Sequence, residues 1–221
     1  MCIWDDGSTD TSPEIAREYA QLDPRICFIP TQHIGRANAL RAAIQATNRP
    51  YLAWIDSDDL LAPDALAATV NILDSNPQIG MLYTDHWLID ESGKALGIGA
   101  RCQIPYSPER LLIDFMTFHF RLTRREIYDR VGGIDLDFPQ AQDYDICLKI
   151  SEVTDIYHHP QPLYYYRVHK DTISQGQRAK QVERAATAVR NALKRRGLND
   201  RYSLNVSPDG RFKIEAKITH S

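Results

Sequence analysis

The sequence has little of what marks several common protein classes. No apolar stretch approaches the roughly 18 residues that a helix needs to span a bilayer, and Met1–Trp4 runs directly into acids instead of an apolar signal segment. The four cysteines stand singly without CxxC spacing, which argues against a disulfide framework or a structural zinc site. We therefore expect a cytoplasmic protein with reduced thiols.

A strong excess of one charge is also missing. The 26 lysines and arginines nearly balance 29 acids, for a formal net charge of −3, so no nucleic-acid partner is expected. The chain contains no GxxxxGK[ST] loop, GxSxG elbow or HExxH helix, and these absences set aside P-loop enzymes, α/β-hydrolases and zincins. Its 221 residues suffice for one sizeable core with an appendage, so the function must come from a specific site.

Short apolar strands alternate with amphipathic helical patterns in the first part of the chain, as in a parallel sheet covered by helices. Cys2–Trp4 and Cys27–Ile29 predict two such strands. Tyr51–Ile55 is almost wholly apolar, as expected of a strand that is buried on both faces. The acidic run Asp56–Asp59 follows it directly and so lies at the carboxyl end of a strand, where open α/β sheets bind ligands.

The rest of the chain predicts further elements and a change of character near its end. In chain order these are a helix opened by Pro63, a strand at Ile79–Tyr83, a hairpin-like excursion from Asp85 to Pro105, a helix at Gln142–Ser151, a long helix at 175–196 and a β-hairpin at 202–217. We predict one domain over residues 1–174, and a C-terminal appendage of helix and hairpin over residues 175–221.

The acidic run is the strongest local signal. On an extended chain Asp56 and Asp58 point to the same side, so two carboxylates can converge on one hard cation while Ser57 faces away. Mg²⁺ and Mn²⁺ prefer oxygen ligands and readily share phosphate oxygens. The alternative is a solvated acidic loop that precedes the helix at Pro63.

Two further motifs bear acids. Asp5–Asp10 follows a strand, so its carboxylates are placed to accept hydrogen bonds from a nucleoside, although its composition also suits a simple turn. Gly132–Asp135 precedes Gln142–Asp145, in which Asp143 stands near a helix start and is suited to act as a general base. An acid that only stabilises the helix N-terminus is the alternative for both Asp143 and Asp145.

Taken together, these motifs resemble the family 2 inverting glycosyltransferases with the GT-A fold. The resemblance rests on DDGSTD at 5–10, IDSDD at 55–59, GGID at 132–135 and QDYDICLKI at 142–150, and it extends to YRVH at 166–169. It implies an α/β protein with an open, mostly parallel sheet flanked by helices. It also implies transfer of a sugar, with inversion, from a nucleotide-diphospho-sugar to a glycan, lipid-linked or protein acceptor, with a divalent metal as cofactor.

The resemblance also implies a role for individual residues. The nucleotide-sugar would contact Asp5, Asp6, Ser8, Arg41, Asp56, Ser57 and Asp58; the metal would contact Asp56, Asp58 and His169; the acceptor side would comprise Gly133, Asp135 and Gln142; and Asp143 would be the catalytic base. Arg41 stands where the family has an asparagine, and it either pairs with phosphate or only decorates its helix.

Family members have a strand and loop before the DDGS strand, and here Met1 stands almost on that second strand. We therefore expect an interrupted sheet with exposed strand-edge groups. An interaction module with impaired catalysis is the alternative function that this feature favours. A third hypothesis concerns the C-terminal helix, whose basic residues would contact the cytoplasmic face of a membrane.

Overall fold

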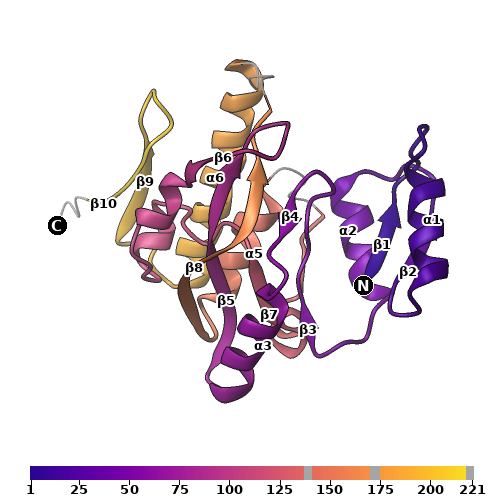
Figure 1. Cartoon of the computed structure of the whole chain (residues 1–221). Coiled ribbons are helices and arrows are strands. Elements are labelled where there is room, and N and C mark those ends of the chain that lie inside the picture. The colour runs from indigo at the N-terminus through magenta and orange to yellow at the C-terminus, as the bar shows by residue number, and fades with distance from the viewer. Residues whose placement is uncertain (137–140, 170–174, 218–221) are drawn as a thin grey trace.

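The computed structural model describes residues 1–136, 141–169 and 175–217, and its first four elements form a small unit of their own. These elements are β1 (Cys2–Asp5), α1 (Ser12–Leu22), β2 (Cys27–Pro30) and α2 (Arg36–Gln45). β1 and β2 pair in parallel, from Cys2 opposite Cys27 to Asp5 opposite Pro30. This pair is not hydrogen-bonded to the larger sheet, and it lies to one side of the molecule (Figure 1).

The larger sheet has six strands. Five follow in the order β3 (Tyr51–Leu52), β7 (Arg121–Arg124), β5 (Ile79–Ile89), β8 (Asp155–Arg167) and β4 (Leu60–Leu61), and β6 (Ala95–Ile98) pairs with β5. Only β5 and β8 are parallel. The prediction of a mostly parallel sheet is therefore wrong for this sheet, because β7 runs back between β3 and β5 and β6 folds back onto β5 through a hairpin.

Helices cover this sheet, and the C-terminal helix belongs to the same core. The remaining elements are α3 (Ala65–Ser75), the 3₁₀ turns η1 (Ala100–Gln103) and η2 (Arg110–Leu112), α4 (Arg125–Arg130), α5 (Gln142–Ile150), α6 (Gln175–Arg195), β9 (Tyr202–Val206) and β10 (Phe212–Ala216). The long helix and the hairpin are thus confirmed. Ala188, Val189 and Ala192 of α6 are fully buried in one cluster with Ile146 and Leu148 of α5. The predicted boundary after residue 174 lies outside the described residues.

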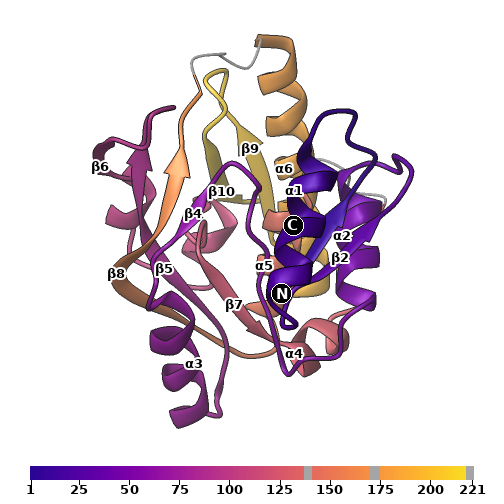
Figure 2. The same ribbon diagram turned by 45° about the vertical axis from the view of Figure 1, so that its right-hand side comes forward.

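The expected interruption of the sheet is present, since no strand pairing joins β1–β2 to the larger sheet within the described residues; Figure 2 shows β1 and β2 together with α1 and α2. β3 ends at Leu52, three residues earlier than predicted, and Ile55 is 41% exposed, so the predicted burial on both faces is wrong. The reason is that β3 pairs only with β7 and is an edge strand.

Apolar contacts of α2 and polar contacts of the loop after it hold the small unit on the rest of the protein. The Arg125 guanidinium donates to the Arg49 carbonyl at 2.8 Å and to the Thr47 hydroxyl at 2.6 Å. Ile44 of α2 is buried in the main core, and Leu40 packs against it. In the part of the chain that the structure describes, the small unit is thus attached to the larger sheet by the packing of a helix and not by hydrogen bonds between strands.

β8 has no counterpart among the predicted elements. Pro160 and Pro162 interrupt its strand pattern, because proline cannot donate to a ladder. The strand absorbs them in a bulge, where pairing passes from Thr84–His159 directly to Asp85–Pro162.

α6 offers little apolar surface of its own. Its apolar side is covered by α5 and by the β9–β10 hairpin, and Arg195 pairs with Glu152 at 2.8 Å. Within residues 1–136, 141–169 and 175–217, no helix combines the length and the apolar character that crossing a membrane requires. Membrane contact through α6 stays a prediction that would rest on its exposed basic side chains.

His119 is a buried imidazole beneath the carboxyl end of β8. It is 5% exposed and stacks on Tyr164 with ring centroids 4.8 Å apart, and its Nδ1 has no hydrogen-bond partner in the structure. Burial, reinforced by the positive charge of Arg121, lowers the pKa of His119 to about 2.

His119→Phe should make the stability of the protein less dependent on pH. As pH falls below about 6.5, the unfolded chain binds a proton at this histidine and the folded chain does not, so the wild type loses about 1.4 kcal/mol of unfolding free energy per pH unit at this position. Phenylalanine removes this loss. Urea denaturation at several pH values between 7 and about 4.5 measures both slopes, and equal slopes would contradict the assignment.

Candidate active site

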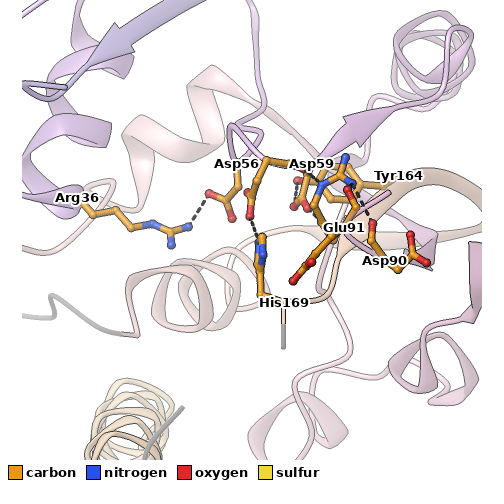
Figure 3. A network of polar contacts seen from close by, with 9 residues as sticks. Arg36, Asp56, Asp59, Asp90, Glu91, Tyr164 and His169 are labelled. Carbon is orange, nitrogen blue, oxygen red and sulfur yellow. Dashed lines mark hydrogen bonds and ion pairs between the residues drawn. The ribbon is translucent and has the colours of Figure 1, made fainter. Parts of the chain in front are cut away.

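A buried carboxylate fixes the acidic run. Asp59 is 8% exposed, and it accepts a hydrogen bond from the Tyr164 hydroxyl at 2.7 Å and one from the Arg167 amide at 2.7 Å (Figure 3). Burial raises the pKa of Asp59, whereas the hydrogen bond from the Arg167 amide acts to lower it. The last acid of the run therefore holds the loop after β3 onto the end of β8 and is not a free ligand.

Arg167 ties a third segment to this loop. Its Nε donates to the Asp58 carbonyl at 2.7 Å, and its Nη1 donates to the carbonyls of Asp90 at 2.9 Å and Glu91 at 3.0 Å in the turn between β5 and β6. One guanidinium thus joins the acidic loop, β8 and the predicted hairpin turn. The backbone of the acidic run is held on two sides.

Asp56 and Asp58 remain accessible above this anchor. Asp56 Oδ1 lies 2.7 Å from Nη2 of Arg36, and Asp58 Oδ2 lies 2.7 Å from Nε2 of His169 (Figure 3). About one third of the Asp56 side chain and almost half of the Asp58 side chain are exposed. A cleft of about 560 Å³ is lined by Arg36, Asp56, Ser57, Asp58, Tyr166, Arg167 and His169.

The donor set in this cleft suits a hard cation that is completed by other ligands. Within the described part of the chain, no three His, Cys, Asp or Glu side chains are grouped to hold a metal ion by themselves. Mg²⁺, however, is usually held by one or two carboxylates together with substrate phosphates and water. Asp56 and Asp58 match that pattern, and His169 adds a nitrogen close to Asp58.

Asp5, Asp6 and Ser8 shape the loop after β1. Asp5 accepts a hydrogen bond from the Ser8 amide at 3.3 Å. The Asp6 carboxylate accepts hydrogen bonds from the amides of Ile34 at 2.8 Å and Gly35 at 3.0 Å, so it binds the loop that leads into α2. Asp6 therefore has a structural role in this state, and nucleoside contact by these residues stays a prediction.

Arg36 is the cleft residue that sequence reasoning missed. It is the first residue of α2, directly after Gly35, whose φ of 85° turns the chain into the helix. Arg41 is exposed farther along α2 and does not line the cleft; its charge acts on Tyr128 instead. The position of Arg36 in the sequence could have pointed to it. A positive charge at the N-terminus of a helix is disfavoured by the helix dipole, so an arginine at this position indicates a partner other than its own helix.

The residues predicted for the acceptor side lie around α4 and α5. Asp143 is half-buried in the first turn of α5, and its Oδ1 accepts a hydrogen bond from the Tyr144 amide at 2.9 Å. Asp145 is 2% exposed and pairs with Lys149 at 2.7 Å, so this acid has a structural role as a buried ion pair within α5, and no side-chain cap of the helix is formed among the described residues. Gln142 is buried, and its Oε1 has no partner in the structure.

Gly133 permits a tight turn after α4. Its φ is 66°, and a Cβ atom here would lie 2.8 Å from the Tyr128 ring, so no other residue fits without displacement. The Tyr128 hydroxyl accepts a hydrogen bond from the Ile134 amide at 3.0 Å. This turn places the segment of Asp135 before α5, and a direct acceptor role for Gly133 or Asp135 stays a prediction.

Comparison with known proteins gives the chain a family. The profile described as Glycosyl transferase family 2 matches residues 1–132. The chain is 30% identical to the chondroitin synthase of Escherichia coli over 198 aligned residues. The alignment covers 90% of this chain and 29% of that protein. The chain is 27% identical over 198 residues to the hyaluronan synthase of Pasteurella multocida, covering 90% of this chain and 20% of that protein. The chain thus spans less than a third of the length of either relative.

Solved structures confirm the fold. S. aureus TarS 1-349 in complex with UDP-GlcNAc aligns with a TM-score of 0.64 at 14% identity, covering 86% of this chain and 57% of that one. The mannosyltransferase PcManGT from Pyrobaculum calidifontis, in complex with GDP-Man and Mn²⁺, aligns with a TM-score of 0.59 at 20% identity, covering 95% and 56%. Both likenesses support the predicted GT-A fold.

Asp59→Ala should destabilise the protein by about 1–3 kcal/mol, because the Tyr164 hydroxyl and the Arg167 amide would be buried without an acceptor. Tyr164→Phe should cost less, and the double variant should cost less than the sum of the two, since both remove the same hydrogen bond. Urea unfolding measures all three variants, with Asp209→Ala in the exposed hairpin turn as control. Strict additivity would show that the two side chains do not interact.

Proposed function

The chain belongs to glycosyl transferase family 2, and we propose on this basis that it transfers a sugar from a nucleotide-diphospho-sugar to an acceptor hydroxyl, with inversion and with the help of a divalent metal. The observation that carries the proposal is the pair Asp56 and Asp58. They face a cleft, on a loop that Asp59 and Arg167 hold from below.

We assign the diphosphate to this cleft. A divalent cation, Mn²⁺ or Mg²⁺, would be held by Asp56 and Asp58 together with oxygens of the diphosphate, with His169 beside Asp58 as a further ligand once the side chains turn to the metal; the ion would neutralise the departing diphosphate. Arg36 is placed to donate to phosphate oxygens once Asp56 turns to the metal, since its guanidinium already lies at the cleft. The solved complex of PcManGT contains Mn²⁺ together with GDP-Man, which supports this choice of ion.

We assign the base to Asp143. Its carboxylate takes the proton of the acceptor hydroxyl while that oxygen attacks the anomeric carbon, and the bond from this carbon to the diphosphate oxygen breaks on the opposite face. Because attack and departure occur on opposite faces, the configuration at the anomeric carbon is inverted. The half-buried position of Asp143 at the start of α5 leaves its second oxygen free of any hydrogen bond within the described residues.

The remaining assignments rest only on where the residues lie in the fold. Asp5, Asp6 and Ser8 would border the nucleoside, because they follow β1 at its carboxyl end. Gly133, Asp135 and Gln142 would border the acceptor beside Asp143. The named relatives make polysaccharide biosynthesis the setting that we propose, with a glycan, lipid-linked or protein acceptor. The cytoplasm, or the cytoplasmic face of a membrane, is the proposed location.

A second candidate function follows from the break between the sheets. The pair β1–β2 is not hydrogen-bonded to β3, and the proposed nucleoside loop after β1 belongs to that pair. A chain that cannot hold a nucleoside there would serve as a carbohydrate or protein interaction module. Calorimetry distinguishes the two functions, since the module predicts no metal-dependent affinity for any nucleotide-sugar.

Asp143→Asn should abolish sugar transfer and leave donor binding within a few-fold of wild type, because the amide keeps the shape of the side chain but cannot take a proton. Transfer is measured as release of nucleoside diphosphate in the presence of acceptor, and donor binding by calorimetry. Asp129→Asn, at an exposed position of α4, serves as the control for lost charge. Undiminished transfer by Asp143→Asn would remove the base assignment.

Asp58→Asn should lose the metal-dependent part of donor binding. A thermal-shift screen of UDP-, GDP- and dTDP-sugars, with and without Mn²⁺, should stabilise the wild type with one donor only when the metal is present. Asp90→Asn, whose side chain binds its own turn, should respond as the wild type does. Donor stabilisation that does not change with Mn²⁺ in the wild type would rule out a metal in the site.

A further inference from the structure

Arg101 presents a cation that the assignments above do not use. It lies in η1, directly after β6, and its guanidinium carbon is 4.5 Å from the centroid of the Phe118 ring and 5.3 Å from that of the Phe115 ring. Two aromatic faces therefore hold the guanidinium in place. The residue as a whole remains exposed to solvent.

A glycine sets the position of this turn. A Cβ atom at Gly99 would lie 2.0 Å from Nε2 of His86, so only glycine lets the chain before Arg101 pass this close to the imidazole. The His86 ring in turn packs against Phe118, with centroids 5.2 Å apart. The close approach of Gly99 to the buried His86 thus fixes the backbone just before Arg101.

The guanidinium has no protein acceptor. Across residues 1–136, 141–169 and 175–217, the side chain of Arg101 makes neither a hydrogen bond nor an ion pair, and its contacts are those with the two rings. Although the residue is exposed overall, partial desolvation of the guanidinium lowers the pKa of Arg101, and among the neighbouring groups Asp143 opposes this shift most. Its N–H donors are open to solvent, so an anion from outside the chain can bind them in place of water.

Aromatic contacts link Arg101 to both halves of the proposed reaction site. On one side, Phe118 contacts Tyr166 at 5.2 Å, and Tyr166 lines the cleft of Asp56 and Asp58. On the other side, Phe115 contacts Tyr144 at 4.7 Å, and Tyr144 directly follows Asp143. The charge of Asp143 also acts on Arg101, so the two side chains are near enough for one acceptor molecule to meet both.

We propose that Arg101 is a specificity residue that binds an anionic group of the acceptor, a carboxylate or a phosphate, next to the hydroxyl that reacts. This inference rests on the proposed function, because it places the acceptor beside Asp143. The planar guanidinium suits either anion through two parallel hydrogen bonds. Arg121 is the other cation of this region, but it is buried and donates to the Thr117 carbonyl at 3.0 Å, so it is not available to a ligand.

The test compares acceptors that differ at one position of the sugar. The probes are para-nitrophenyl glucuronide, para-nitrophenyl glucoside, and the same glucoside phosphorylated on its primary hydroxyl. Acceptor binding to the full chain is followed by NMR titration, and transfer by release of nucleoside diphosphate. The variants are Arg101→Gln and Arg101→Lys, with Arg110→Gln as matched control, since exposed Arg110 only pairs with Asp114.

Arg101→Gln should weaken binding of a charged probe by roughly tenfold to a hundredfold and leave binding of the neutral glucoside unchanged. Arg101→Lys should retain part of the affinity, because it keeps the charge but not the fork. The probe that loses affinity identifies the anion as carboxylate or phosphate. The inference is overturned if the wild type prefers neither charged probe, or if all three probes lose affinity equally.

Binding of the probes and binding of the donor are separate readouts. If the wild type shows no metal-dependent affinity for a nucleotide-sugar, the proposed function fails while the anion preference is still measured directly. If donor binding is normal in Arg101→Gln and the anion preference is unchanged, only the inference about Arg101 fails.

Discussion

The buried Asp59 carboxylate is the interaction on which the site depends. A carboxylate with 8% exposure is stable only when its oxygens are paired, and here the Tyr164 hydroxyl and the Arg167 amide supply the partners from one strand. The two acids before it are thereby presented to the cleft on a backbone that cannot move away. Their charges are met by Arg36 and His169, which arrive from α2 and from the segment after β8. Two other parts of the chain, the start of α2 and the end of β8 with the segment directly after it, thus converge on four consecutive residues.

An aromatic floor connects this acidic loop to the segment of Asp143. His119 stacks between the rings of Tyr164 and Tyr166, Phe118 contacts Tyr166, and Phe115 contacts Tyr144. Aromatic rings bury a large apolar surface and carry few polar atoms that need hydrogen bonds, so together they form a rigid and poorly hydrated base. Above such a base a charge such as that of Arg101 is felt more strongly than in water. The same floor therefore stabilises the fold and sets the electrostatics of the site.

The break between the two sheets determines how the unit of β1 and β2 is attached to the rest of the protein. No strand pairing joins β1 to β3 within the described residues. The small unit is attached instead through α2, whose Ile44 is buried in the main core, and through the hydrogen bonds of Arg125 to the loop after this helix. A helix packed on a core holds a position but leaves the facing strand edges unpaired. The loops after β1 and β2 are in turn fixed to one another by Asp6. The acids of the cleft and those at the end of β1 thus belong to two units that no strand pairing joins within the described residues.

The sequence by itself determined the class of the protein, the order of most elements and the acids of the candidate site. Local signals were enough for these, because a strand followed by Asp56–Asp59, or a long amphipathic run at 175–196, is read within one segment. It did not reveal β8, whose prolines are tolerated only through a bulge that depends on pairing with β5. It also did not separate Arg36 from Arg41, or Asp59 from Asp56 and Asp58, since the residues are alike in type and nearly adjacent. Only the tertiary structure decided which of them is buried, paired or open to a ligand, because burial and partners come from segments more than 100 residues away in the chain, such as Arg167 for Asp59.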